Sequence, residues 1–137
     1  MNRWPPLLVC LLMGCASSPP PERADALETP LAASGDPGRG REVFLTRDEG
    51  RCVLCHAAPG VELAGNVGPS LAGVGSRLTP AQMRLRIADI TRVYPDSVMP
   101  TFHRTEGMVR VAPQFRDKPA LTGQQVEDLV AWLSTLK

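Results

Sequence analysis

Two thiols and an imidazole stand close together in this chain, because Cys52, Cys55 and His56 form a Cys-x-x-Cys-His motif. Thiols at this spacing can bond to the two vinyl groups along one edge of a porphyrin, and the adjacent histidine can bind the iron from one face. A zinc site would need further Cys or His ligands, and only His103 remains outside the N-terminal segment. A redox-active dithiol would not need a histidine directly after the second cysteine. The motif therefore predicts one covalently bound haem c.

The opposite face of the iron needs a second donor if the haem transfers electrons rather than binding small molecules. Met99 precedes Pro100 in an irregular segment well downstream of His56, and a methionine on such a loop can direct its thioether at the iron. Ligation by histidine and methionine raises the reduction potential relative to ligation by two histidines. His103 is the competing ligand, because a neutral imidazole also binds iron. Met83 lies on the apolar face of a predicted helix and is expected in the core.

The His56 ring should also donate its other N–H to an acceptor that fixes its orientation. The segment Gly68-Pro69-Ser70-Leu71 follows His56 along the chain. The Cys-x-x-Cys-His motif followed by Gly-Pro resembles the arrangement in c-type cytochromes, and this resemblance implies that the carbonyl of Pro69 is the acceptor. A simple turn is the alternative interpretation, because Gly-Pro also forms turns.

Three helices are predicted to position these segments. The first begins at Asp36-Pro37 and ends near residue 49, the second spans about 80–92, and the third follows Thr122. Both later helices begin with a capping box, in which a threonine side chain and a glutamine three residues later bond each other's backbone. Gly40 is unfavourable inside a helix, and its presence indicates that another helix backbone crosses closely there.

Long loops connect these helices. Residues 51–77 have neither helical nor strand periodicity and carry repeated glycines, and residues 108–111 alternate in polarity as a short strand would. A loop of this length in a compact domain usually surrounds something functional. The sequence therefore predicts an all-α domain with long loops and a small hairpin, wrapped around one covalent haem.

Composition narrows the function classes. The chain has 137 residues, a net charge of +1 and scattered basic residues, which argues against a nucleic-acid partner. Only 4% of the residues are aromatic. Because a small domain buries little apolar surface of its own, a buried porphyrin would supply part of the core.

The N-terminal segment predicts export. Residues 1–14 have the positive start and short apolar run of a signal peptide, and the run is too short to span a bilayer. The end of that run resembles a bacterial lipobox, which would leave a lipidated Cys15. Ordinary cleavage near Ala16-Ser17 is the alternative. We expect a periplasmic protein, tethered to a membrane only through this lipid anchor.

Two further segments complete the predicted organisation. Residues 15–35 are rich in proline, serine, alanine and glutamate, which is typical of a flexible linker. Residues 36–137 are predicted to form one domain. Cys52 and Cys55 are the cysteines that remain outside the leader, so no disulfide framework is expected to stabilise that domain.

The order of these motifs resembles that of a class I cytochrome c. A narrower resemblance is to SoxX, the small monohaem subunit of the sulfur-oxidising SoxAX cytochrome, and it covers roughly residues 38–137. It is carried by the segments Asn66–Gly75, Leu85–Asp89, Met99–Phe102 and Lys118–Leu133.

The resemblance implies a role in a larger complex. SoxAX oxidatively couples thiosulfate to a cysteine of the SoxYZ carrier, and the coupling chemistry belongs to a haem on SoxA, a dihaem or monohaem subunit. SoxX receives the electrons and passes them to a soluble cytochrome, and its haem has histidine and methionine ligands, which fits His56 and Met99. The chain would then belong to an L-cysteine S-thiosulfotransferase complex without being catalytic alone.

Two other interpretations share the same motifs. One is an independent, lipid-anchored electron carrier to a terminal oxidase or another acceptor. The other is a structural or ligand-sensing haem protein with an open iron face.

Overall fold

The computed structural model describes residues 25–137, which are helical and contain no strand. The α-helices are α1 (Pro37–Leu45), α2 (Val74–Arg77), α3 (Pro80–Asp89) and α4 (Gly123–Leu133), and the short 3₁₀ turns are η1 (Cys52–Leu54), η2 (Ile90–Arg92) and η3 (Pro113–Phe115). The all-α prediction is confirmed. Within residues 25–137 no helix has the length and apolar character needed to cross a bilayer.

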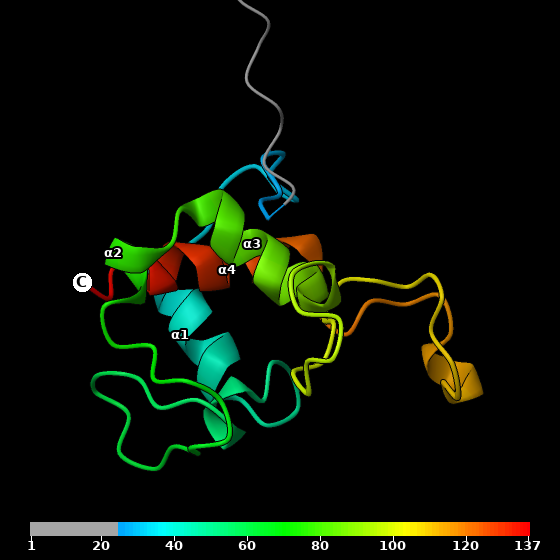
Figure 1. The fold of residues 1–137 in the computed structure, drawn as a ribbon, viewed down its shortest axis with the longest axis horizontal. Coiled ribbons are helices and arrows are strands. Elements are labelled where there is room, and N and C mark those ends of the chain that lie inside the picture. Colours follow the sequence, from blue (N-terminus) through cyan, green and yellow to red (C-terminus); the bar gives the residue numbers. More distant parts are fainter. Residues whose placement is uncertain (1–24) are drawn as a thin grey trace, which may run out of the picture.

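Helices α1 and α4 cross directly over each other (Figure 1). A Cβ atom on Gly40 would lie 1.9 Å from the carbonyl oxygen of Asp128, so the two backbones touch and only glycine fits. One turn further along α1, the rings of Phe44 and Trp132 pack with their centroids 4.8 Å apart. The close crossing predicted from Gly40 is therefore confirmed.

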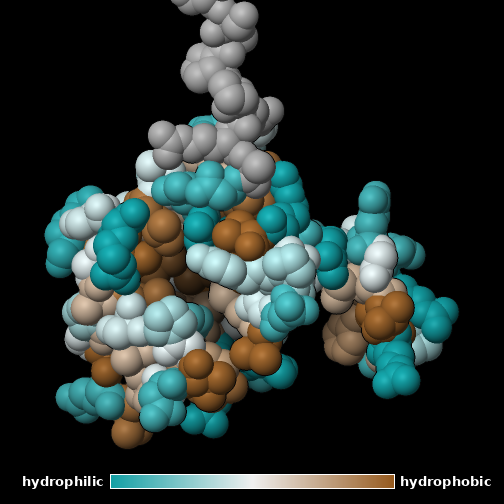
Figure 2. Space-filling view, in the orientation of Figure 1, coloured by the Kyte–Doolittle hydropathy of each residue, from teal (hydrophilic) through white to brown (hydrophobic). Residues whose placement is uncertain are grey.

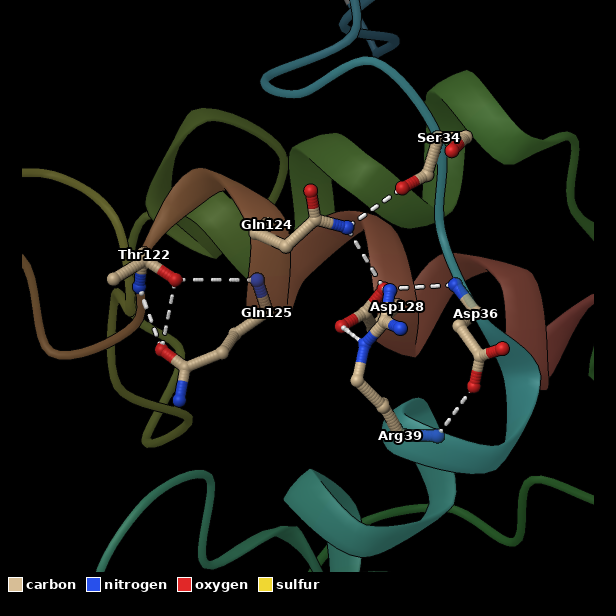
Figure 3. Close-up of polar contacts among 7 residues, drawn as sticks. All are labelled: Ser34, Asp36, Arg39, Thr122, Gln124, Gln125 and Asp128. Carbon is tan, nitrogen blue, oxygen red and sulfur yellow. Dashed lines mark hydrogen bonds and ion pairs between the residues drawn. The ribbon is translucent and has the colours of Figure 1, made fainter.

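Polar contacts hold the start of α1 against α4 (Figure 3). The carboxylate of Asp128 accepts from the backbone N–H of Asp36 at 2.7 Å and from Arg39 Nε at 2.9 Å. Burial would raise the pKa of Asp128, but these donors, together with Gln124, outweigh it and the pKa lies below its ordinary value. Asp36 also caps α1 by accepting from the N–H of Arg39 at 2.8 Å.

Helix α3 packs against α4 and completes the core. Both helices begin with the predicted capping boxes, at Thr79 and at Thr122. Met83 is 2% exposed and lies in the core, as expected. The predicted second helix is continuous as α3 to Asp89 and continues as the 3₁₀ turn η2.

Residues 25–35 are packed on α3 and α4, so the prediction of a flexible linker is wrong for them. The N–H of Leu27 donates to the carbonyl of Ala81 at 2.9 Å, and the N–H of Leu31 donates to Glu127 Oε1 at 2.9 Å. The Arg84 guanidinium lies 2.6 Å from that carboxylate and donates to the Leu27 carbonyl. These contacts are made by backbone groups, which leave no trace in composition. Cys15 and the rest of residues 1–24 lie outside the described residues.

The predicted strand at residues 108–111 is also wrong. Arg110 has a φ of 59° and Gly107 a φ of 68°, and these left-handed residues break the extended backbone that a strand needs. Residues 104–118 instead project from the body and carry η3 near their tip (Figure 1); we call them the arm. The helix α2 and the 3₁₀ turns η1 and η3 were not predicted, because they are too short to show a periodic pattern.

Candidate haem-binding site

The Cys-x-x-Cys-His motif forms one tight turn. The N–H groups of Cys55 and His56 both donate to the carbonyl of Cys52, at 3.1 and 2.9 Å. Arg51, directly before the motif, has a left-handed φ of 55° that turns the chain into η1. Both cysteines are free thiols and partly exposed. The motif therefore presents two thiols and an imidazole from a single turn.

The Cys52 thiol lacks the lowered pKa that the nucleophile of a redox-active dithiol needs. Burial raises the pKa of Cys52 to about 12. A redox-active dithiol needs a lowered thiol pKa, because the thiolate is the nucleophile. Among residues 25–137 no group of three or more His, Cys, Asp or Glu side chains is arranged to hold a metal ion.

The His56 imidazole is fixed by the loop that follows it. Its Nδ1 lies 2.8 Å from the carbonyl oxygen of Pro69. With Nδ1 donating to that carbonyl, Nε2 is the nitrogen available to an iron. The same contact was expected from the sequence, and its role toward a haem stays a prediction.

Backbone hydrogen bonds join that loop to the motif. The N–H groups of Gly65, Gly68 and Leu71 donate at 2.8 Å to the carbonyls of Val53, Cys55 and Ala57, respectively. Every third residue of the loop is therefore tied to every second residue of segment 53–57, and these bonds hold Pro69 within hydrogen-bond distance of the imidazole.

Gly68 has a role that sequence reasoning missed. A Cβ atom there would lie 2.3 Å from His56 Cε1 and 2.7 Å from each ring nitrogen. Glycine is needed because the imidazole lies flat against the backbone. The available signal was a glycine directly before the proline that accepts from His56, but that position alone does not reveal what the missing Cβ would touch.

Met99 lies between η2 and the arm. Its backbone N–H donates to the Ser97 hydroxyl oxygen at 3.1 Å, and its partly buried side chain packs against the hydrophobic core, as that of Cys52 does. The structure therefore places the thioether and the motif at the edge of the same core. The face drawn in Figure 2 has a recess near its middle with apolar side chains around it.

His103 occupies a different environment, at the base of the arm. Its Nδ1 lies 2.9 Å from the carbonyl oxygen of Leu121, and its backbone N–H donates to the carbonyl of Ala88 at 3.1 Å. These contacts join the arm to α3 and to the start of α4. These contacts give the His103 imidazole a structural role. In the described part of the chain, the Met99 thioether makes no hydrogen bond.

The residues present fit a haem c. Two thiols come from one turn, one imidazole is oriented with its Nε2 available, and a thioether lies at the edge of the same core. Cys52 and Cys55 would hold the porphyrin, and His56 and Met99 would bind its iron.

Comparisons with known proteins agree with this geometry. The family model for cytochrome c matches residues 38–137. The crystal structure of SoxXA from P. pantotrophus superposes with a TM-score of 0.76 and 38% sequence identity, covering 83% of this chain and 91% of that one. A cytochrome c-553-like protein of Synechocystis sp. is 29% identical over 106 residues, which are 77% of this chain and 74% of that protein.

Proposed function

From the premise that the chain belongs to the cytochrome c family, we propose that it is the electron-transfer subunit of a SoxAX-type complex. It is a SoxX-like monohaem cytochrome with one covalent haem c. The observation that carries the proposal is the 38% identity over 91% of a chain in the SoxXA structure, at a TM-score of 0.76.

Five residues hold the haem in this proposal. Cys52 and Cys55 would form the thioether bonds, and His56 and Met99 would bind the iron. When bound, the haem accepts and releases one electron at a time. Pro69 orients His56 through the 2.8 Å contact with Nδ1, which keeps the imidazole in one tautomer with Nε2 directed to the metal.

The reaction of the complex is the oxidative coupling of thiosulfate to a cysteine of the SoxYZ carrier. A SoxA-like dihaem or monohaem subunit supplies the reacting centre, and this chain passes the electrons on to a soluble cytochrome. In residues 25–137 the cysteines are Cys52 and Cys55, and both are needed for the haem. The chain therefore has no thiol left there to take part in the coupling and is not catalytic alone.

We place the protein in the periplasm, tethered through a lipidated Cys15. The support is the signal-peptide pattern of residues 1–14 and the lipobox-like sequence that ends at Cys15. Metabolic labelling with palmitate tests this tether, with Cys15→Ser as the control. Equal labelling of both proteins, or of neither, would refute it.

Affinity purification from cells grown on thiosulfate tests the main proposal. The tagged chain is expected to bring down a larger haem protein in a one-to-one ratio, and a tagged unrelated periplasmic haem protein serves as the control. Recovery of a stable monomer that exchanges electrons with many acceptors would favour the independent carrier. Fast carbon monoxide binding by the reduced protein would favour an open iron and would contradict ligation by Met99.

A further inference from the structure

The arm, residues 104–118, exposes large apolar side chains away from the body of the protein. Val109 is 82% exposed, Phe115 62% and Met108 43%. No residue of the arm is buried. Figure 1 shows the arm extending beyond the helices, and Figure 2 shows apolar side chains gathered on the lobe that it forms. A separate lobe of this kind buries little of its own apolar surface.

The base of the arm is firmly attached. The N–H of Leu121 donates to the carbonyl of Phe102 at 2.7 Å, which closes the two ends of the arm against each other. His103 Nδ1 contacts the carbonyl of Leu121, and Arg104 lies 3.4 Å from the carboxylate of Asp89 on α3. The arm therefore leaves the body at a defined place, rather than as a loose loop.

The arm is also close to the proposed haem site along the chain. It begins directly after the Met99–Phe102 segment, and the Thr101 hydroxyl lies 3.6 Å from Met108 Sδ. A protein bound to the arm would consequently sit beside the loop that carries the Met99 ligand. A redox partner has to lie close to the haem, and this loop would bind the haem iron through Met99.

The charge of the arm differs from that of the whole chain. Residues 104–118 contain four basic and two acidic side chains, a net charge of +2, whereas the full chain carries +1. The remainder of the chain is therefore net negative. Arg104 is paired with Asp89, which leaves Arg110, Arg116 and Lys118 as the basic side chains of the arm, against Glu106 and Asp117. This excess of basic over acidic side chains on a segment with exposed apolar side chains complements an acidic rim around an apolar groove. It disfavours a second copy of the same arm, because like charges would face each other.

We propose that the arm is the docking element for the haem-bearing partner subunit, which accepts it in an apolar groove with an acidic rim. This inference rests on the proposed function. A lasting subunit contact is favoured over a passing encounter with a soluble acceptor, because permanent interfaces are larger and more apolar than electron-transfer encounters. Val109 and Phe115 fill the groove, and Arg116 meets the acidic rim.

Point variants of the holoprotein test this assignment by measuring affinity for the purified partner subunit. Val109→Asp and Phe115→Asp are each expected to weaken binding about thirtyfold, as at the centre of an interface. Leu63→Asp is the matched control, because Leu63 is 91% exposed and belongs to the loop that follows the haem motif. It should leave the affinity within about twofold. Circular dichroism and the haem spectrum verify that each variant folds.

Charge reversal provides a second measurement. Arg116→Glu is expected to slow association about tenfold at low salt, with a smaller effect at high salt, because the rim steers the encounter. Unchanged affinity and association rates in all the arm variants would overturn the proposal while leaving the function intact. Equal weakening by Leu63→Asp would also overturn it. If the wild-type protein did not bind the partner at all, the proposed function itself would fail. A wild-type dimer that Val109→Asp dissociates would assign the arm to self-association instead.

Discussion

Replacing Gly68 by alanine is the sharpest test of how the loop holds the proposed iron ligand. The added Cβ would lie 2.3 Å from His56 Cε1, whereas ordinary contacts begin at 3.4 Å. The imidazole or the loop must therefore move by about 1 Å. The loop cannot retreat freely, because the Gly68 N–H is bonded to the Cys55 carbonyl at 2.8 Å. The ring is expected to move instead, and its 2.8 Å contact with Pro69 is expected to break.

The expected cost follows from these two changes. Overpacking a filled site costs about 1–3 kcal/mol, and losing one net hydrogen bond costs about 1 kcal/mol. The free energy of unfolding should fall by about 2–4 kcal/mol, which corresponds to a guanidinium midpoint lower by about 1 M. Because the Nδ1 contact fixes the orientation of the ligand, the bond between imidazole and iron should weaken as well.

Denaturation of the holoprotein, followed by far-ultraviolet circular dichroism and by the haem absorbance, measures both effects. Gly38→Ala is the matched control, because its Cβ would meet only the Asp36 side chain, at 3.1 Å, on an exposed part of α1. That variant should be unchanged or stabilised by up to about 1 kcal/mol, through helix propensity. A Gly68→Ala protein with the wild-type midpoint and the wild-type ferric haem spectrum would refute the reasoning.

Three further predictions concern the second axial ligand, the helix crossing and the buried ion pair. Met99→Ala should abolish the methionine-to-iron charge-transfer band and lower the reduction potential, while His103→Ala should keep that band; its persistence in Met99→Ala would assign the ligand elsewhere. Gly40→Ala should lower the free energy of unfolding by about 3 kcal/mol in denaturant titrations, because its Cβ would lie 1.9 Å from the Asp128 carbonyl. Burial raises the pKa of Glu127, but its hydrogen bonds outweigh burial and the net pKa lies below the ordinary value of 4.5. The stabilisation from the ionised Glu127 is therefore present above pH 4.5, and it is lost as the pH falls through the lower pKa of the folded protein. Glu127→Gln should cost about 3 kcal/mol at neutral pH and make the acid-side decline shallower in pH-dependent unfolding, and an unchanged slope would contradict this assignment.

The sequence predicted helix starts and a helix crossing correctly where one or a few neighbouring residues determine the structure. Capping boxes located the starts of α3 and α4, and Gly40 indicated the crossing of α1 with α4 because glycine in a helix needs a reason. Each of these signals lies within a few residues and depends on backbone geometry that other residue types cannot adopt or satisfy.

The errors arose where tertiary contacts decide the structure. Residues 25–35 have the composition of a linker, yet Leu27 and Leu31 are held by the Arg84–Glu127 pair, whose partners are 43 residues apart in the sequence. Alternating polarity at residues 108–111 indicated a strand, but a strand needs a neighbour to pair with, and the arm provides none in the structure. Neither outcome could be derived from a local pattern.

The geometry of the turn formed by the Cys-x-x-Cys-His motif explains why this motif predicts the site, whereas the sequence of the loop after it does not. The loop is joined to the turn through three backbone hydrogen bonds, from Gly65, Gly68 and Leu71, each 2.8 Å long. Backbone groups are present in every residue, so these bonds place few demands on side chains. Side-chain identity matters only where a side chain would collide, as at Gly68, or where chemistry is done, as at His56. Gly65 is constrained in the same way as Gly68, because a Cβ atom there would lie 1.9 Å from the carbonyl oxygen of Leu54. The intervals between these constrained residues therefore fix the site.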